Sequence, residues 1–239
     1  TDLAYRLLLN EEYPGWLHEV KLGATTVWER WNSLDENGRI SSTGMNSLNH
    51  YSYGAVLEWI FRHVAGIDVT EQGPGGKMMR ISPKVDYKLG SASAVYDSAS
   101  GCYRCGWQIA NGDQITVTVT VPFGAKAQVI LPYAPDSVYH DTDNPLFETV
   151  ENGICCVKAG QYTVTYKAAS PLKKSYSVDS TLEDLLAEPA IRAFLSNMME
   201  VDMIPDLAYG LTLRQAAEAF AGGVSAEQAQ RLNALLEEF

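Results

Sequence analysis

The stretch Gly23–Tyr53, GATTVWERWNSLDENGRISSTGMNSLNHYSY, sets the carboxylate of Glu29 between the indoles of Trp28 and Trp31 and ends just after His50. Aromatic rings stack on the C–H face of a sugar, while a carboxylate accepts a proton from water. This combination is typical of a pocket that cleaves a glycosidic bond. The same residues also fit a buried tryptophan pair with a surface glutamate between them, and the pattern alone leaves both interpretations open.

The clearest helical pattern in the chain follows this stretch, over residues 49–65. Its apolar residues recur at intervals of three and four, which is the period of an amphipathic helix; they are Tyr53, Val56, Leu57, Ile60, Phe61 and Val64. Gly66 then stands where a helix commonly ends. His50 is therefore expected at the start of this helix, where a capping or packing role is the alternative to ligand contact. Before the motif, LAYRLLLN and WLHEVKLG predict two shorter helices.

From residue 67 the hydrophobic period falls to two, which predicts strands. Apolar and polar residues alternate over residues 103–109 and 115–121, and Asn111-Gly112 between them is a signal for a type I′ hairpin turn. Shorter runs predict four more strands, over residues 92–97, 127–131, 154–157 and 162–166. Many short strands separated by turns predict an antiparallel β-sandwich.

After residue 171 the pattern returns to helices. Ser180 with Glu183, and Ser225 with Gln228, have the spacing of capping boxes, and Pro189 suits the first position of a helix. Three or four helices of this length form a small bundle. The predicted fold class is therefore α+β with three domains: helices over 1–66, an antiparallel β-sandwich over 67–171, and a small helical module over 172–239.

Composition and charge exclude several function classes. The formal net charge of -11 argues against nucleic acid as a partner. No apolar run reaches the length of a membrane span, so no membrane partner is expected. The chain opens on Thr1 without an initiator methionine or signal peptide, which predicts a piece of a longer polypeptide.

Four cysteines raise the question of a metal site. Cys102 and Cys105 form a C-x-x-C where a turn is expected to run into a strand. Residues three apart on a strand point to opposite faces, which is a poor arrangement for two ligands of one metal ion. Cys155 and Cys156 are adjacent, which is equally awkward for a tetrahedral site. We therefore expect free thiols, no metal and no cofactor. Reduced thiols fit a cytoplasmic protein.

Two segments of the motif resemble the signature of bacterial α-L-rhamnosidases, family 78 of the glycoside hydrolases. These segments are GATTVWERW and GMNSLNHYSYG. Further along, GSASAVYDSASGCYRCGW and AGQYTVTYK resemble the C-terminal β-sandwich of that family. The likeness runs from about residue 5 to about residue 167. It implies that residues 1–66 are the terminal helices of an incomplete (α/α)6 barrel, or α/α toroid.

The resemblance implies an inverting hydrolysis of terminal α-L-rhamnosyl linkages in a glycoside or polysaccharide. Carried over, Glu29 would be the general base that activates water, and His50 would contact sugar hydroxyls. Trp28 or Trp31 would line the pocket, and Arg30 would pair with a neighbouring carboxylate. Inversion also needs a general acid about 6.5–9.5 Å from the base. In the family that acid lies on an earlier hairpin whose motif is not in this sequence, so the chain is expected to be inactive alone.

Two functions from other classes fit the same sequence. The sandwich and its helical flanks would serve as a non-catalytic carbohydrate-binding or structural module, or the helical tail would dock another protein. In addition, the helices before Gly66 carry apolar faces with few partners in this chain, which predicts self-association through them.

Overall fold

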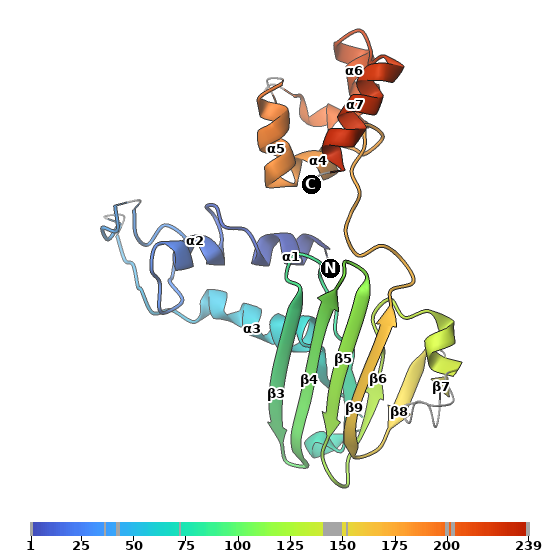
Figure 1. The fold of residues 1–239 in the computed structure, drawn as a ribbon. Helices are drawn as coiled ribbons and strands as arrows, with labels where there is room; N and C mark the ends of the chain where they lie inside the picture. Colours follow the sequence, from blue (N-terminus) through green and yellow to red (C-terminus); the bar gives the residue numbers. More distant parts are fainter. Residues whose placement is uncertain are drawn as a thin grey trace. The chain divides into compact units, whose positions relative to one another are not determined.

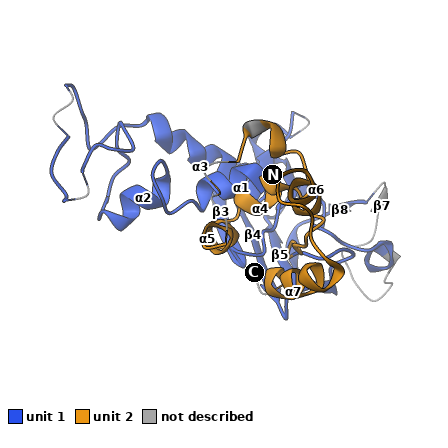
Figure 2. Ribbon diagram, turned by 90° about the horizontal axis from the view of Figure 1, so that it is seen from above, with its two compact units in different colours: residues 1–172 blue, residues 173–239 orange. Residues whose placement is uncertain are grey.

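The computed structural model describes residues 2–35, 37–41, 44–71, 73–140, 150–151, 153–198, 201 and 204–237. The chain forms two compact units, residues 1–172 and residues 173–239, which Figure 2 colours blue and orange. The predicted α+β class is confirmed, because helices precede two β-sheets in the first unit and the second unit is helical. The division of the first unit at residue 66 stays a prediction.

The first unit opens with five short helical elements (Figure 1). They are α1 (Asp2–Leu8), α2 (Trp16–Lys21), the 3₁₀ turn η1 (Ser52–Ala55), α3 (Val56–Trp59) and the π-helical turn η2 (Ile60–Val64). The helix predicted over 49–65 is thus a run of three helical geometries that begins at Ser52. The predicted start is wrong because the amide of His50 donates to the carbonyl oxygen of Val27 instead of starting the helix.

The rest of the first unit is a two-sheet sandwich. One sheet has the order β1-β2-β6-β8-β7 and the other β3-β4-β5-β9, and Figure 1 shows them packed face to face. The strands are β1 (Ile67–Val69), β2 (Met78–Ile81), β3 (Ser91–Ser98), β4 (Gly101–Ala110), β5 (Gln114–Val121), β6 (Lys126–Val129), β7 (Val150–Glu151), β8 (Ile154–Val157) and β9 (Gly160–Lys167). Short 3₁₀ turns lie at η3 (Pro74–Gly76) and η4 (Asp136–His140).

The strand pairs are antiparallel apart from β2 with β6, which run parallel. The hairpin between β4 and β5 turns at Asn111 and Gly112, whose φ values of 53° and 82° match the predicted type I′ turn. The sequence did not predict β1 and β2, which have three and four residues.

One apolar core holds the sandwich and the N-terminal helices together. The inward residues of β4 and β5 meet the second sheet, and Tyr5 of α1 and Val64 of η2 belong to the same cluster. Trp107 of β4 is 3% exposed, and its indole Nε1–H donates to the carbonyl oxygen of Val64 at 2.7 Å. The helices therefore rest on the sandwich through their inner side.

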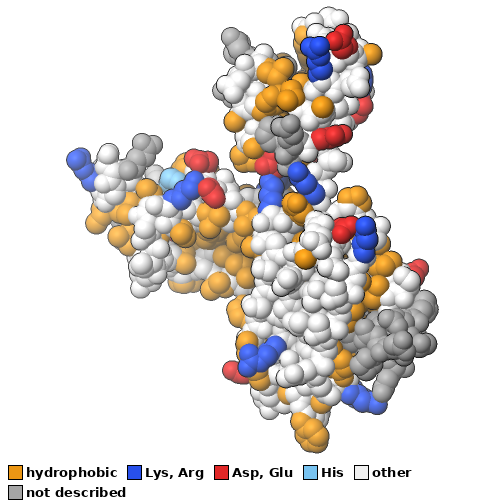
Figure 3. All heavy atoms as spheres, in the orientation of Figure 1, with side chains coloured by type: hydrophobic (Ala, Val, Ile, Leu, Met, Phe, Trp, Pro, Cys, Tyr) orange, Lys and Arg blue, Asp and Glu red, His pale blue; other side chains and the backbone are white. Residues whose placement is uncertain are grey.

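The outer side of these helices has few partners. Within the predicted apolar stripe, Val64 is buried, whereas Leu57 is 57% and Phe61 40% exposed. Leu3, Leu7 and Val20 are exposed as well. Figure 3 shows hydrophobic side chains gathered over α1, α2 and α3.

The second unit has four α-helices among its described residues, around a core of its own. They are α4 (Leu182–Leu186), α5 (Pro189–Ser196), α6 (Leu213–Phe220) and α7 (Ala226–Leu236), with a 3₁₀ turn η7 (Asp206–Ala208) between α5 and α6. The capping box of Ser225 and Gln228 at α7 is confirmed, as is Pro189 at the start of α5.

The cap predicted for α4 is wrong. Its N-cap is Thr181, whose hydroxyl accepts the backbone N–H of Asp184 at 3.2 Å. The hydroxyl of Ser180 instead accepts the N–H of Ser177 at 3.0 Å. The predicted position was therefore one residue too early, because the serine is used by the preceding turn.

Candidate functional site

The motif residues are brought together by backbone pairing between two segments that are distant in the sequence. The N–H of Glu29 donates to the carbonyl oxygen of Ser47 at 2.9 Å, and the N–H of His50 donates to that of Val27 at 2.8 Å. One bond is donated by each segment, so the two segments hold each other side by side. They set Glu29 and His50 on neighbouring stretches of backbone, and both side chains keep part of their surface exposed.

The loop between these two segments is closed by hydrogen bonds between residues near its two ends. The hydroxyl of Ser33, a fully buried residue, donates to Asn46 Oδ1 at 2.6 Å, and Asn46 Nδ2 donates back to the Ser33 carbonyl at 2.9 Å. The N–H of Arg30 donates to Ser33 Oγ at 3.2 Å, and the Arg30 carbonyl accepts the Ser33 N–H. Arg30 thus shapes this turn through its backbone, and the carboxylate pairing expected of its side chain stays a prediction.

The two indoles of the motif have different surroundings. Trp28 is 3% exposed, so its ring is buried in the chain itself. Trp31 is half-buried and stacks on Tyr53, with ring centroids 3.9 Å apart and an interplanar angle of 8°. Of the two rings proposed as pocket walls, Trp31 therefore offers surface to a ligand.

Trp16 of α2 completes this aromatic cluster. Its ring meets Trp31 edge-on at 5.1 Å, and its Nε1–H donates to the Tyr53 carbonyl oxygen at 3.1 Å. The reasoning from sequence missed Trp16 and Tyr53 as parts of the site. The density of aromatic residues around the motif was the available signal, but their contacts depend on how the loop folds back.

His50 lies two residues before η1 and acts as a cap. Its Nδ1 accepts the N–H of Ser52 at 3.3 Å, and its ring stacks on Tyr51 with centroids 5.4 Å apart. A neutral ring that accepts at Nδ1 carries its hydrogen on Nε2. The capping role of His50 therefore leaves Nε2–H as a donor for a ligand, so the two roles weighed from the sequence are compatible.

A buried carboxyl group lies directly behind the motif. Glu19 of α2 is 3% exposed, and its Oε2 accepts the backbone N–H of Trp28 at 3.4 Å. Burial raises the pKa of the Glu19 carboxyl, and the hydrogen bond from Trp28 opposes that rise. The sequence assigns Glu19 no role, because Glu19 lacks the sequence context of the family's general acid and its burial depends on the fold.

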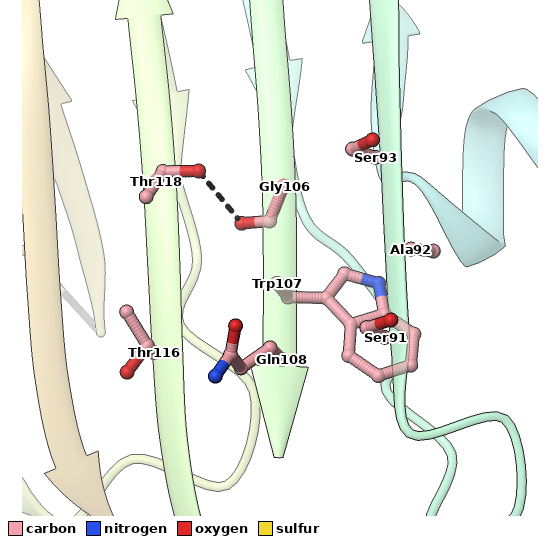
Figure 4. Close-up of a pocket in the computed structure, with 8 residues that line it drawn as sticks. All are labelled: Ser91, Ala92, Ser93, Gly106, Trp107, Gln108, Thr116 and Thr118. Carbon is pink, nitrogen blue, oxygen red and sulfur yellow. Dashed lines mark hydrogen bonds between the residues drawn. The ribbon is translucent and has the colours of Figure 1, made fainter. Parts of the chain in front are cut away.

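A second candidate site is a shallow depression of about 410 Å³ on the outer face of the β3-β4-β5-β9 sheet (Figure 4). Its lining is uncharged: Ser91, Ala92, Ser93, Gly106, Trp107, Gln108, Thr116 and Thr118. Gly106, which has no side chain, lies among these lining residues. The hydroxyl of Thr118 donates to the Gly106 carbonyl oxygen at 3.3 Å. Figure 3 shows this sheet face largely free of charged side chains.

The four cysteines are free thiols, as the sequence predicted. Cys105 is buried on β4 and Cys102 is partly exposed, which fits their expected opposite faces. Burial raises the pKa of the Cys105 thiol to about 12. In the described ranges, no three His, Cys, Asp or Glu side chains gather as a metal site would require. Over the same residues, no helix has the length and apolar character needed to span a membrane.

Comparisons with known proteins identify the family. Residues 1–64 match the family model described as the bacterial alpha-L-rhamnosidase 6 hairpin glycosidase domain, and residues 66–144 match that of the bacterial alpha-L-rhamnosidase C-terminal domain. An alpha-L-rhamnosidase of Alteromonas sp. is 39% identical over 164 residues, or 68% of this chain and 17% of that protein. One from Formosa agariphila is 38% identical over 151 residues, or 63% of this chain and 16% of that protein.

A solved structure of an alpha-L-rhamnosidase is also similar to this chain. The crystal structure of Streptomyces avermitilis alpha-L-rhamnosidase complexed with L-rhamnose superimposes with a TM-score of 0.60 at 32% identity. The match covers 70% of this chain and 16% of that one, so the chain spans a small part of the relatives' length. Through residues 1–144, this chain therefore belongs to the bacterial α-L-rhamnosidase family.

Proposed function

We propose that residues 23–53 supply the water-activating side of a site that hydrolyses terminal α-L-rhamnosyl linkages. Glu29 is the general base, and it takes a proton from the water that attacks the anomeric carbon. His50 donates from Nε2 to a sugar hydroxyl, and Trp31 forms part of the apolar wall. In the inverting reaction the departing oxygen receives its proton from a second carboxyl group on the opposite side of the ring.

The observation that carries this proposal is the pairing of Glu29 and His50 through the two segments described above. Hydrogen bonds of 2.9 Å and 2.8 Å fix both backbones at adjacent positions. A base and a sugar-binding donor must act on the same ring, so their separation has to be set by structure rather than by flexible loops.

The general acid is assigned to none of the residues in this chain. The chain spans 17% of the length of its Alteromonas relative, and the family resemblance implies a general acid on an earlier hairpin whose motif is not in this sequence. We infer that this stretch has little or no turnover alone. Robust hydrolysis of a chromogenic α-L-rhamnoside by this chain, abolished in Glu29→Gln, would overturn that inference.

Binding is the direct test of the site. L-rhamnose added to the ¹⁵N-labelled chain is expected to shift the backbone amides of residues 28–31 and His50 in a saturable way, with D-glucose as the control sugar. Glu29→Ala and His50→Ala should each weaken this response. The proposal fails if these amides stay unmoved at high L-rhamnose concentration.

The depression on the sandwich favours a second candidate function, which is carbohydrate binding without catalysis. Uncharged hydroxyl and amide groups pair with sugar hydroxyls, and the depression presents several side by side. The same titration separates the two functions. Shifts confined to β4 and β5 amides, lost in a Gln108→Ala, Thr118→Ala double variant but kept in Glu29→Ala, would favour the sandwich.

A further inference from the structure

Among the described residues near the proposed site, Glu19 is the buried acidic residue that the mechanism above does not use. Its Oε1 is the single buried side-chain polar atom without a hydrogen-bond partner among the described residues. A carboxyl group removed from water without full pairing is costly. A leucine or methionine would fill the same space without that cost, so the carboxyl group calls for a reason.

The reason lies in the peptide group that Glu19 contacts. Its Oε2 accepts the N–H of Trp28, the residue between Val27 and Glu29. The Val27 carbonyl and the Glu29 N–H both face the segment 47–50. The carbonyl and the N–H of one trans peptide group point in opposite directions. The Trp28 N–H shares its peptide group with the Val27 carbonyl, so it points away from segment 47–50 and requires another acceptor. Glu19 supplies it.

We propose that Glu19 is a positioning residue for Glu29. Glu19 holds segment 27–29 from the side opposite to Ser47 and His50. This inference rests on the proposed function, because it assigns Glu19 to the support of the general base. The role requires an acceptor atom at Oε2, not a charge. Glutamine therefore preserves it, whereas methionine, similar in size, does not.

The test compares Glu19→Gln with Glu19→Met in the full chain by two measurements. The first is amide hydrogen exchange at Trp28. A buried N–H left without an acceptor is strongly disfavoured, so Glu19→Met should speed exchange at Trp28 by about tenfold or more. Glu19→Gln should stay within about threefold of wild type. The Trp107 amide in β4 reports whether the fold is intact in both variants.

The second measurement is the L-rhamnose response at the Glu29 and His50 amides. Glu19→Met is expected to weaken the apparent affinity by about fivefold, and Glu19→Gln to restore it. A purely structural residue would lower global stability without this selective rescue. The positioning role would be overturned by equal Trp28 exchange rates in wild type and Glu19→Met. It would also be overturned if Glu19→Gln and Glu19→Met weakened the L-rhamnose response equally. A wild-type chain with no L-rhamnose response would instead overturn the proposed function, so the two failures are distinct.

Discussion

The amide of His50 donates a 2.8 Å hydrogen bond to the carbonyl oxygen of Val27. This bond joins the start of the helical run to the segment that carries Glu29. It also removes His50 from the helix, so that η1 begins at Ser52 and the histidine caps it through Nδ1. The proposed base and the proposed sugar-binding residue are therefore positioned by the pairing of segments 27–29 and 47–50.

The stack of Trp31 on Tyr53 should stabilise the site. Tyr53→Ala removes the ring at 3.9 Å and is expected to lower the free energy of unfolding of the first unit by about 1–2 kcal/mol. Tyr53→Phe keeps the ring and should stay within about 0.5 kcal/mol of wild type. Urea unfolding followed by tryptophan fluorescence reports the first unit alone, because all five tryptophans lie within residues 1–172. Equal stability of the two variants would contradict the stacking role.

Glu19 should make stability depend on pH. Because burial raises its folded-state pKa, its contribution is fully present below the unfolded pKa of about 4.3 and is lost as pH rises through the folded-state value. The unfolding free energy of Glu19→Gln minus that of wild type should therefore increase as pH rises above about 4.3. Urea unfolding between acid and neutral pH measures this gain. Glu19→Met and Glu19→Gln, neither of which titrates at this position, should differ by a constant amount. A difference in unfolding free energy between wild type and Glu19→Gln that does not change with pH would count against the prediction.

The bond from Trp107 to Val64 should hold the helices to the sandwich. Trp107→Phe leaves the Val64 carbonyl without its 2.7 Å donor and reduces the packed area, so we expect a loss of about 1–3 kcal/mol in the first unit. Thr163→Ala, on the exposed outer face of β9, is the control and should change stability by less than about 0.5 kcal/mol. Unfolding midpoints that match between Trp107→Phe and the control would argue against this anchor.

Gly66 should be the least replaceable glycine at the junction between helices and sandwich. Its φ is 80°, and an added Cβ would lie 2.2 Å from the backbone nitrogen of Pro83. Gly66→Ala is therefore expected to cost at least about 3 kcal/mol. Gly112 has nearly the same φ, 82°, but open space around it, so Gly112→Ala should cost about 1–2 kcal/mol from backbone strain alone. Similar losses at both positions would show that crowding at Pro83 is relieved by movement.

The exposed apolar side of the N-terminal helices should cause self-association. Sedimentation velocity is expected to show a sedimentation coefficient that rises with concentration, because Leu57 and Phe61 leave apolar area in water. A Leu57→Lys, Phe61→Lys double variant should reduce this dependence. Leu207→Lys, at an exposed leucine of the second unit, should not. A monomer at all concentrations would contradict the prediction.

The sequence by itself determined the elements whose signals are local. Alternation over β4 and β5 and the Asn111-Gly112 turn predict their hairpin, because side-chain direction and turn geometry depend on neighbouring residues. Ser225 with Gln228 and Pro189 mark their helix starts for the same reason. The motif around Glu29 likewise pointed to the family that the comparisons identify.

Only the tertiary structure decided how those elements are used. The sequence does not distinguish a buried Trp28 from a half-exposed Trp31, because the difference comes from Tyr53 and Trp16, which reach the motif through folding of the chain. The short parallel pair of β2 with β6, and the burial of Glu19 against the Trp28 amide, arise in the same way. Burial and pairing between distant segments depend on the whole unit, and no local pattern encodes them.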